Sequence, residues 1–429
     1  MRRLFDFGKQ LAFSQTAKDT YLVMVANVVN GITGLLFTVL VARFLSVAEF
    51  GTFSSLLNLT LIVVSLVDLG MTQGVVNFLP PFIDRGQEKK VKHYLGNMVG
   101  TVGLLAVAAA VALLLLPANW VIKIAGSDNR IYLLLAGLGI IGASLHLYFL
   151  GVFQAFKKFF AWSATEIVLA IVRVVWVAGL VLTGLTIGKA LSGLIIGALT
   201  SFIMIWRFWP AGKIHLQLSL KTIKKVFRFS RWLWFVNMII SVYGRMDVLL
   251  LTAMTSSVIV GQYAAAARLA LVFPLAVNSL NAVVAPRFAS FPDLDSMLSY
   301  TKKALLLVLA VAGGLAMFLV LAKPIISVVY GSRYLSAVPL FQGLVLANLP
   351  LIITIPATNS LVYFFKRPQV VTGISFMQLL VMSSLTWGLV PHLVGQAPVL
   401  GFTVANGLGL VLMYGFWTRF YLRRRHEAT

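Results

Sequence analysis

Residues 27–59 read NVVNGITGLLFTVLVARFLSVAEFGTFSSLLNL, and residues 237–269, which lie 210 positions later, read NMIISVYGRMDVLLLTAMTSSVIVGQYAAAARL. The two stretches align without a gap and share six identical positions, among them Asn27 with Asn237 and Gly51 with Gly261. The offset is close to half of the 429 residues. We interpret the pair as an internal repeat, in which the second half of the chain repeats the fold of the first.

Composition indicates a membrane protein. Hydrophobic residues make up 60% of the chain, charged residues make up only 11%, and the mean hydropathy is +0.94. A soluble globular protein contains about a quarter charged residues. Cysteine is absent, which excludes disulfides and cysteine-based metal sites.

Hydropathy predicts the membrane spans. A helix needs about 20 apolar residues to cross a bilayer core of roughly 30 Å. Twelve ranges satisfy this condition: 21–44, 48–72, 94–117, 131–154, 163–184, 188–208, 231–254, 258–286, 302–322, 337–364, 369–391 and 398–421. With the repeat, they predict an all-α polytopic membrane protein with two pseudo-symmetric lobes of six transmembrane helices each. The predicted parts are an N-lobe (1–206), a basic cytoplasmic linker (207–230) and a C-lobe (231–429). Transporters built from such repeats typically bind substrate at the repeat interface.

The basic residues predict the orientation. With both termini in the cytoplasm, the segments on that side hold 26 of the 35 Lys and Arg, and the opposite side holds six. Short cytoplasmic loops carry an excess of Lys and Arg. The net charge of +23 therefore mainly reflects the excess of Lys and Arg in the cytoplasmic segments. It also favours attraction to anionic membrane lipids. This distribution argues against a nucleic-acid partner, and residues 213–231 are predicted to form an amphipathic segment on the inner leaflet.

Two stretches carry a resemblance to a known family. VARFLSVAEFGTFSSLLNLTLIVVSLVDLGMTQGVVNFLP (41–80) and DVLLLTAMTSSVIVGQYAAAARL (247–269), followed by APRF (285–288), resemble the polysaccharide flippases of Wzx type. These belong to the MOP superfamily, which includes the MATE exporters and the lipid II flippase MurJ. MurJ-like members typically add two C-terminal helices, so a chain of twelve favours the Wzx branch.

The resemblance implies a function and a location. It implies a two-lobed transporter of the bacterial inner membrane that moves polyprenyl-pyrophosphate-linked oligosaccharide to the outer leaflet by alternating access. The repeat unit would belong to O-antigen, capsule or exopolysaccharide. A coupling cation (H+ or Na+) and glycan polymerase machinery are the further candidate partners.

Three arginines fall near the middle of predicted helices, namely Arg173, Arg245 and Arg268. A charge at the centre of a membrane helix costs about 2.5–3.5 kcal/mol on insertion scales, so these side chains are not expected to face lipid. We interpret them as the lining of a cationic central cavity, because the planar guanidinium suits a diphosphate. The alternative is that they pair with acids and brace helices.

Other polar residues complete the predicted site. Asn27, Asn58 and Asn278 are candidate substrate contacts, and the repeat places Asn58 opposite Arg268 and Asn278 opposite Asp68. Asp68, Glu166 and Asp247 are candidates for ion coupling or, alternatively, for structural pairing. Because Arg245 and Asp247 lie two residues apart, a continuous helix would turn them to nearly opposite faces. Asp247 is then expected to face the next helix, where Arg268 is a possible partner.

Catalytic chemistry has no support in the sequence. No nucleotide-binding, metalloprotease or serine-hydrolase motif is present, and no cofactor or metal site is predicted. Two other functions remain open. One is a MATE-like ion-coupled exporter of organic cations, and the other is a membrane glycan polymerase or ligase that uses the same lipid carriers.

Overall fold

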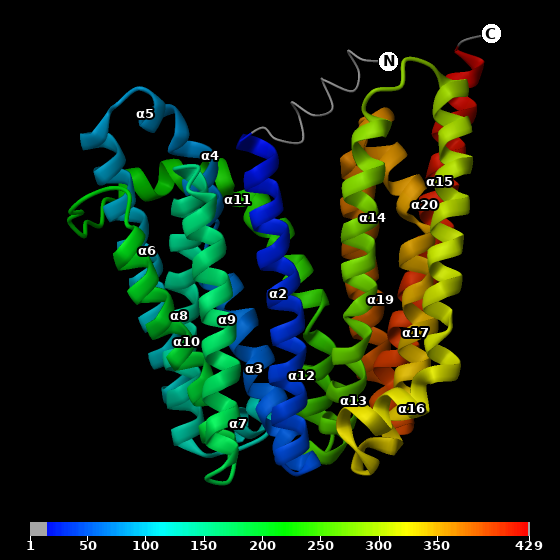
Figure 1. The fold of residues 1–429 in the computed structure, drawn as a ribbon. Helices are drawn as coiled ribbons and strands as arrows, with labels where there is room; N and C mark the ends of the chain where they lie inside the picture. Colours follow the sequence, from blue (N-terminus) through cyan, green and yellow to red (C-terminus); the bar gives the residue numbers. More distant parts are fainter. Residues whose placement is uncertain (1–14, 428–429) are drawn as a thin grey trace. The chain divides into compact units, whose positions relative to one another are not determined.

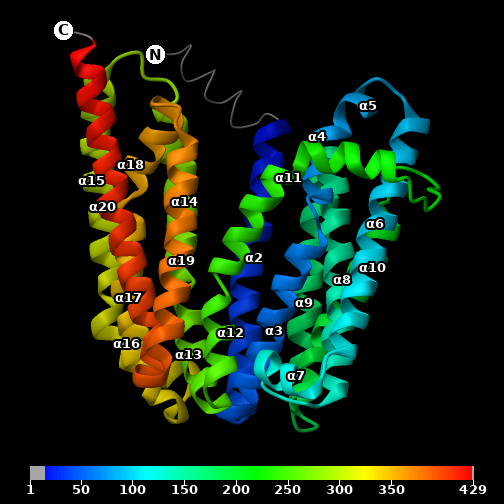
Figure 2. The same ribbon diagram turned by 180° about the vertical axis from the view of Figure 1, so that it is seen from behind.

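A computed structural model describes residues 15–427, and within this range every regular element is a helix. The predicted cytoplasmic tail before Gln15 lies outside the described residues. The chain divides into two compact units, which Figures 1 and 2 show from opposite sides. Unit 1 comprises residues 1–46 and 55–242, and unit 2 comprises residues 47–54 and 243–429.

The observed helices correspond to the predicted membrane spans. Ten ranges of the described residues are long and apolar enough to cross a membrane. One of these ranges, Pro368–His426, contains two helices that pack along each other, α19 (Pro368–Leu393) and α20 (Ala397–His426). Another candidate span consists of α11 (Leu220–Tyr243) and α12 (Met246–Met254), which meet at a 48° bend. Counted in this way, the described residues contain the twelve spans of an all-α polytopic membrane protein.

Unit 1 is a helical bundle around an apolar core of Val, Leu, Met and Ala side chains contributed by several helices. Its long helices pack in neighbouring pairs, as α2 does with α9 and α6 with α8. Besides α11, its helices are α2 (Gln15–Phe44), α3 (Val47–Val67), α4 (Met71–Phe78), α5 (Pro80–Asp84), α6 (Glu88–Leu115), α7 (Ala118–Ala125), α8 (Arg130–Ala155), α9 (Phe159–Val181) and α10 (Ile187–Phe208). The first eight residues of α3 belong to unit 2, so this helix takes part in both units.

Unit 2 contains shorter and more interrupted helices. Two breaks lie close to prolines, whose rings prevent a regular helical hydrogen bond. α13 (Ser257–Ala270) gives way to α14 (Val272–Phe288) just before Pro274, and α17 (Val338–Ile353) ends three residues before Pro356. The other elements are α15 (Leu294–Ala316), α16 (Phe318–Tyr330), α18 (Ile355–Asn359) and the short helical turns Ser332–Ala337, Ser360–Phe364 and Val394–Gln396.

One predicted helix is interrupted. A continuous helix over 231–254 was expected, but α11 ends at Tyr243 and α12 begins at Met246. Arg245 occupies the N-cap position of α12 with φ −144° and ψ −11°, outside helical geometry. Gly244, which costs a helix about 1 kcal/mol relative to alanine, lies directly at the break. The expectation that Arg245 and Asp247 occupy opposite faces of one continuous helix is therefore wrong, because Arg245 lies outside the helix that contains Asp247.

The segment between α10 and α11 packs onto unit 1. Asn97 of α6 accepts a hydrogen bond from the backbone of Ser219 (2.5 Å), and His93 lies 2.9 Å from Gln217. In α11, the small or apolar Thr222, Val226 and Ser230 are buried at four-residue spacing. The exposed basic residues of α11 are Lys221, Lys224, Lys225, Arg228 and Arg231. The first part of α11 is therefore amphipathic, and it runs across one end of the unit 1 bundle in Figure 2.

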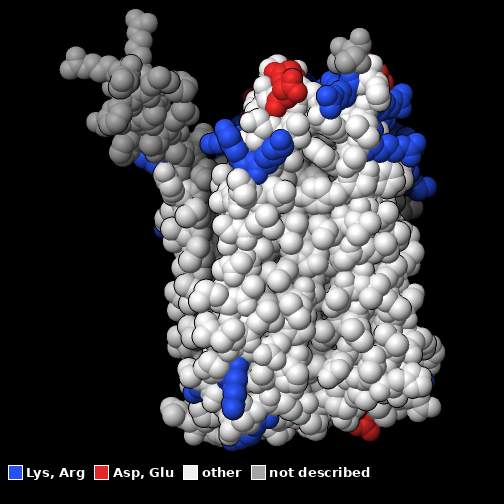
Figure 3. Space-filling view, turned by 90° about the vertical axis from the view of Figure 1, so that its right-hand side faces the viewer, with Lys and Arg blue, Asp and Glu red and all other residues white. Residues whose placement is uncertain are grey.

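Charge collects at the helix ends. On the face drawn in Figure 3, Lys and Arg lie at the two ends and an uncharged band separates them. Of the 13 Lys and Arg between residues 243 and 427, nine lie on the side predicted to be cytoplasmic and only two, Lys323 and Arg333, lie on the other. Arg245 and Arg268 lie within candidate membrane spans, Arg245 at the N-cap of α12 and Arg268 in the last turn of α13.

Candidate functional site

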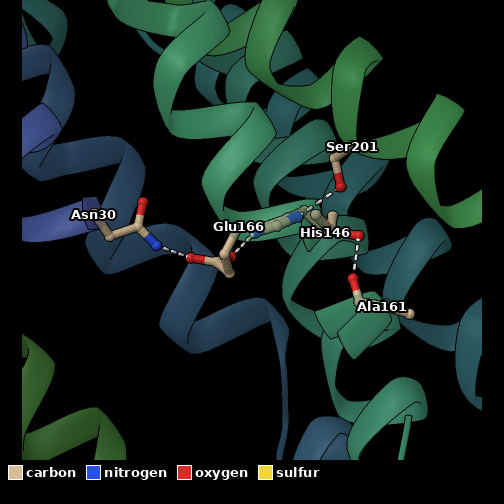
Figure 4. A network of polar contacts seen from close by, with 6 residues as sticks. Asn30, His146, Ala161, Glu166 and Ser201 are labelled. Carbon is tan, nitrogen blue, oxygen red and sulfur yellow. Dashed lines mark hydrogen bonds and ion pairs between the residues drawn. The ribbon is translucent and has the colours of Figure 1, made fainter. Parts of the chain in front are cut away.

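Unit 1 contains a buried polar network that joins four helices (Figure 4). Glu166 of α9 accepts a hydrogen bond from the side-chain amide of Asn30 of α2. Its Oε1 lies 2.8 Å from Nε2 of His146 of α8, and His146 Nδ1 lies 2.6 Å from the hydroxyl of Ser201 of α10. The side chains of Glu166 and His146 are only 14% and 16% exposed. An acid and an imidazole in this arrangement can hold or exchange a proton.

Arg173 lies about two turns beyond Glu166 on α9, in a groove beside two glycines of α10. A Cβ added to Gly197 would lie 3.3 Å from Arg173 Nε and Nη2, and one added to Gly193 would lie 3.5 Å from Arg173 Cγ. The guanidinium carbon is also 5.9 Å from the ring centre of Phe37, which is a cation–π distance. Arg173 is close enough to Glu166 for their opposite charges to attract. The two glycines therefore make room for the arginine side chain.

In unit 2, Asp247 is buried against α13. Its Oδ2 accepts a hydrogen bond of 2.6 Å from the hydroxyl of Tyr263, and its Oδ1 accepts one of 2.8 Å from the backbone of Val248. Both oxygens therefore act as acceptors, as in an ionised carboxylate. Asp247 also stands in the first turn of α12, where the helix dipole favours a negative charge.

Arg245 and Arg268 lie near each other in unit 2. Their positive charges are close enough to repel, and Arg245 is also close enough to Asp247 to attract it. Arg245 and Arg268 are both half-buried. Arg268 approaches the phenol of Tyr330, whose buried hydroxyl has no hydrogen-bond partner among the described residues. Tyr330 and Arg268 are 62 residues apart in the chain, so only the tertiary fold brings them close together.

The remaining predicted residues lie elsewhere in the two units. Asn27 is exposed on α2, one turn from Asn30, while Asn58 is half-buried on α3 and Asn278 is exposed on α14. Asp68 follows α3 directly and accepts hydrogen bonds from the backbones of Gly70 and Thr72, both at 3.1 Å, and from the Thr72 hydroxyl. It therefore stabilises the turn into α4.

Sequence reasoning gave little weight to several residues that the structure places in these clusters. His146, Ser201, Tyr263 and Tyr330 were not among the predicted site residues. Ser201 had a usable signal, because it shares one face of α10 with Gly193 and Gly197 at four-residue spacing. No group of three His, Asp or Glu side chains within residues 15–427 is arranged to hold a metal ion.

Comparisons with known proteins identify the class of fold. Lipid II flippase MurJ in an inward closed conformation matches with a TM-score of 0.76 and 17% identity, over 94% of this chain and 89% of that chain. An inward-facing multidrug resistance MATE transporter of the MOP superfamily matches with a TM-score of 0.67 and 12% identity, over 91% and 95%. The MATE multidrug transporter DinF-BH, in a ligand complex, matches with a TM-score of 0.64 and 14% identity, over 93% and 94%. The fold is therefore that of the MOP exporters.

The family follows from the sequence. Residues 16–291 match the family model described as polysaccharide biosynthesis protein, so the chain belongs to that family. A search among curated proteins finds no match. The family match and the fold agree with the resemblance to the Wzx-type polysaccharide flippases of the MOP superfamily, which was based on residues 41–80 and 247–288. The chain is a multi-pass membrane protein.

Proposed function

We propose that the protein moves polyprenyl-pyrophosphate-linked oligosaccharide from the cytoplasmic to the outer leaflet of a bacterial inner membrane by alternating access. Membership of the polysaccharide biosynthesis family supports the substrate class, since such oligosaccharides are the membrane-bound precursors of surface polysaccharide. The MurJ-like fold supports transport of a lipid-linked substrate.

The arginine pair of unit 2 carries the proposal. Arg245 and Arg268 are two half-buried cations within the candidate membrane spans, and a bound anion would attract both of them, in addition to the attraction between Asp247 and Arg245. A diphosphate offers several acceptor oxygens to the two guanidinium groups. The unpartnered hydroxyl of Tyr330 beside Arg268 adds a hydrogen-bond donor for the same ligand. Arg173 of unit 1 is a second cationic position, and Asn27, Asn58 and Asn278 are proposed sugar contacts.

The proposal also includes the orientation of the protein in the membrane and the energy source of transport. The excess of Lys and Arg at one end of the helices supports a topology with both termini in the cytoplasm. Glu166 with His146 is the proposed site at which a proton or sodium ion couples to transport, because an acid and an imidazole are paired there at 2.8 Å inside the bundle. Asp68 and Asp247 are better supported as structural groups, since local hydrogen bonds already occupy their oxygens.

A reconstituted assay tests the proposal. The purified protein is placed in liposomes with a fluorescent polyprenyl-diphosphate oligosaccharide, and arrival in the outer leaflet is followed with and without proton and sodium gradients. We expect flipping by the native protein and a loss of on the order of tenfold, or about 1.4 kcal/mol, in R245A and in R268A. An exposed arginine at a helix end, in the variant R333A, serves as the control.

Two outcomes would contradict it. Native flipping by both arginine variants would exclude the arginine pair as the diphosphate site. Transport of a fluorescent organic cation such as ethidium, without flipping of the lipid-linked oligosaccharide, would instead identify a MATE-like exporter. The likeness of fold to the multidrug transporter DinF-BH makes that comparison worth including.

A further inference from the structure

A pocket of about 400 Å³ opens at one end of unit 1, separate from the two polar clusters. It lies where α5, the first turn of α6, the end of α8 and residues 210–212 meet. Its walls include the apolar Phe82, Phe156 and Ala211 and the polar Gln87 and Lys92. Nothing in the proposed transport path uses these residues.

Two glycine turns form the pocket walls. Gly86 and Gly212 have φ values of +63° and +66°, in the left-handed region that favours glycine. The indole of Trp209 donates a 2.6 Å hydrogen bond to the carbonyl of Gly212 and closes the second turn. A Cβ on Gly212 would lie 3.8 Å from Lys92 Nζ, so the ammonium group stands beside this turn. The pocket is therefore held in place by specific backbone conformations.

The polar side chains that line the pocket are those of Gln87, Glu88 and Lys92. Gln87 Oε1 is buried and has no hydrogen-bond partner within residues 15–427. A buried acceptor without a donor is energetically unfavourable, and a ligand with a hydroxyl group would supply the missing donor. Lys92 pairs with Glu88 at 3.2 Å, but the Glu88 side chain is 80% exposed whereas that of Lys92 is 40% exposed. Both members of this ion pair line the pocket, and Lys92 is the less exposed of the two.

The surroundings favour a negatively charged ligand. Residues 84–92 contain four basic and two acidic residues. The pocket lies at the N-terminal end of α6, whose dipole also favours an anion. Because α6 is a candidate membrane span, its first turn falls at the level of the lipid headgroups. Lys90, which is 5.7 Å from the ring centre of Phe82, is a cation–aromatic contact of the kind found at that level.

We propose that this pocket binds the headgroup of an anionic phospholipid that carries free hydroxyl groups, such as phosphatidylglycerol. The phosphate binds Lys92, a headgroup hydroxyl donates to Gln87, and the apolar walls cover the glycerol carbons. The site is independent of the proposed transport function. A soluble glycerol phosphate shares the same chemistry, and the position at the membrane edge favours the lipid as its source.

Lipid binding to the purified full-length chain tests the site. Bound lipid is counted by native mass spectrometry, and thermal unfolding is recorded, with phosphatidylglycerol, phosphatidylethanolamine or phosphatidylcholine. We expect preferential binding of and stabilisation by phosphatidylglycerol. Q87L should weaken its binding about 2- to 12-fold, as loss of one hydrogen bond implies, and K92M by about tenfold or more. A211F, which fills the pocket, should abolish it, whereas K89M, an exposed neighbour on α6 that does not line the pocket, should have by far the smallest effect.

Several results would overturn the proposal. Equal binding of phosphatidylglycerol and phosphatidylcholine would exclude headgroup recognition, and equal effects of Q87L, K92M, A211F and K89M would exclude this pocket. Stabilisation by sn-glycerol 1-phosphate without binding of phosphatidylglycerol would assign the pocket to a soluble ligand. Displacement of the lipid, one for one, by a polyprenyl diphosphate would assign it to the transport substrate.

Discussion

Gly51 of α3 and Gly261 of α13 meet at a backbone-to-backbone contact within unit 2. A Cβ on Gly51 would lie 1.9 Å from the carbonyl oxygen of Ser257, and a Cβ on Gly261 would lie 2.1 Å from that of Val47. The two glycines are also the positions that the 210-residue repeat relates to each other. Equivalent residues of the two sequence halves thus pack against each other, and each requires the absence of a side chain.

Alanine at either glycine should destabilise the protein. The atoms in the way are backbone atoms, which cannot rotate aside, so we expect a loss of about 1–3 kcal/mol from overpacking for G51A and for G261A. The measurement is the thermal unfolding midpoint of the purified protein in detergent. G313A is the matched control, because nothing lies within 4 Å of a Cβ at that helical position. An equal midpoint for G261A and G313A would contradict the contact.

Two buried tyrosines offer a matched test of the Asp247 site. Tyr263 and Tyr148 are both fully buried, but Tyr263 donates to the carboxylate of Asp247, whereas Tyr148 donates to the backbone carbonyl of Leu95 at 3.1 Å. Hydrogen bonds to charged groups contribute about 1.5–3 kcal/mol and neutral ones about 0.5–1.5 kcal/mol. Y263F should therefore lower the unfolding midpoint more than Y148F, and D247A should lower it further. The reverse order of the two phenylalanine variants would mean that Asp247 is not the charged acceptor.

The groove that holds Arg173 gives a second route to test its role. We expect R173A to reduce flipping on the order of tenfold, or about 1.4 kcal/mol. G197L should have the same effect, because its side chain would occupy the space of the guanidinium group. G179L, on α9, is the control, since nothing lies within 4 Å of a Cβ there. Flipping at the native rate by G197L would show that the position of Arg173 is unimportant for transport.

The network around Glu166 allows its charge to be removed with little change in shape. In E166Q the amide can donate to His146 Nε2, and the other tautomer of the imidazole then donates to Ser201, so both contacts persist. We expect near-native stability but loss of the response of flipping to proton and sodium gradients. E166L should instead destabilise the protein by about 1–3 kcal/mol, because it leaves Asn30 and His146 without their partner.

The control for that experiment is D84N, which alters an exposed acid at the end of α5. It should change neither stability nor gradient dependence. If E166Q kept the full response to both gradients, Glu166 would be a structural group, and the coupling site would have to lie elsewhere.

The all-helical fold could be predicted because the formation of membrane helices depends on local hydropathy. Runs of about 20 apolar residues must form helices in a bilayer, where each backbone polar group needs a partner within its own segment. The break at Gly244 and Arg245 was not predictable in the same way, because glycine also occurs within regular membrane helices. The three arginines could be singled out from the sequence, but the residues that surround them in the fold could not. Asn30 and Glu166 are 136 residues apart, and hydropathy contains no information about which helix faces which.

By itself, the sequence determined the membrane class, the helical spans, the repeat at 210 residues and the family, since these depend on composition, periodicity and motif. The tertiary structure alone decided which polar groups meet: Glu166 with His146, Asp247 with Tyr263, and Arg245 near Arg268. The physical reason is that contact between helices depends on their rotation and axial register. These are set by the packing of small residues such as Gly51, Gly197 and Gly261, whose partners lie far away in the chain.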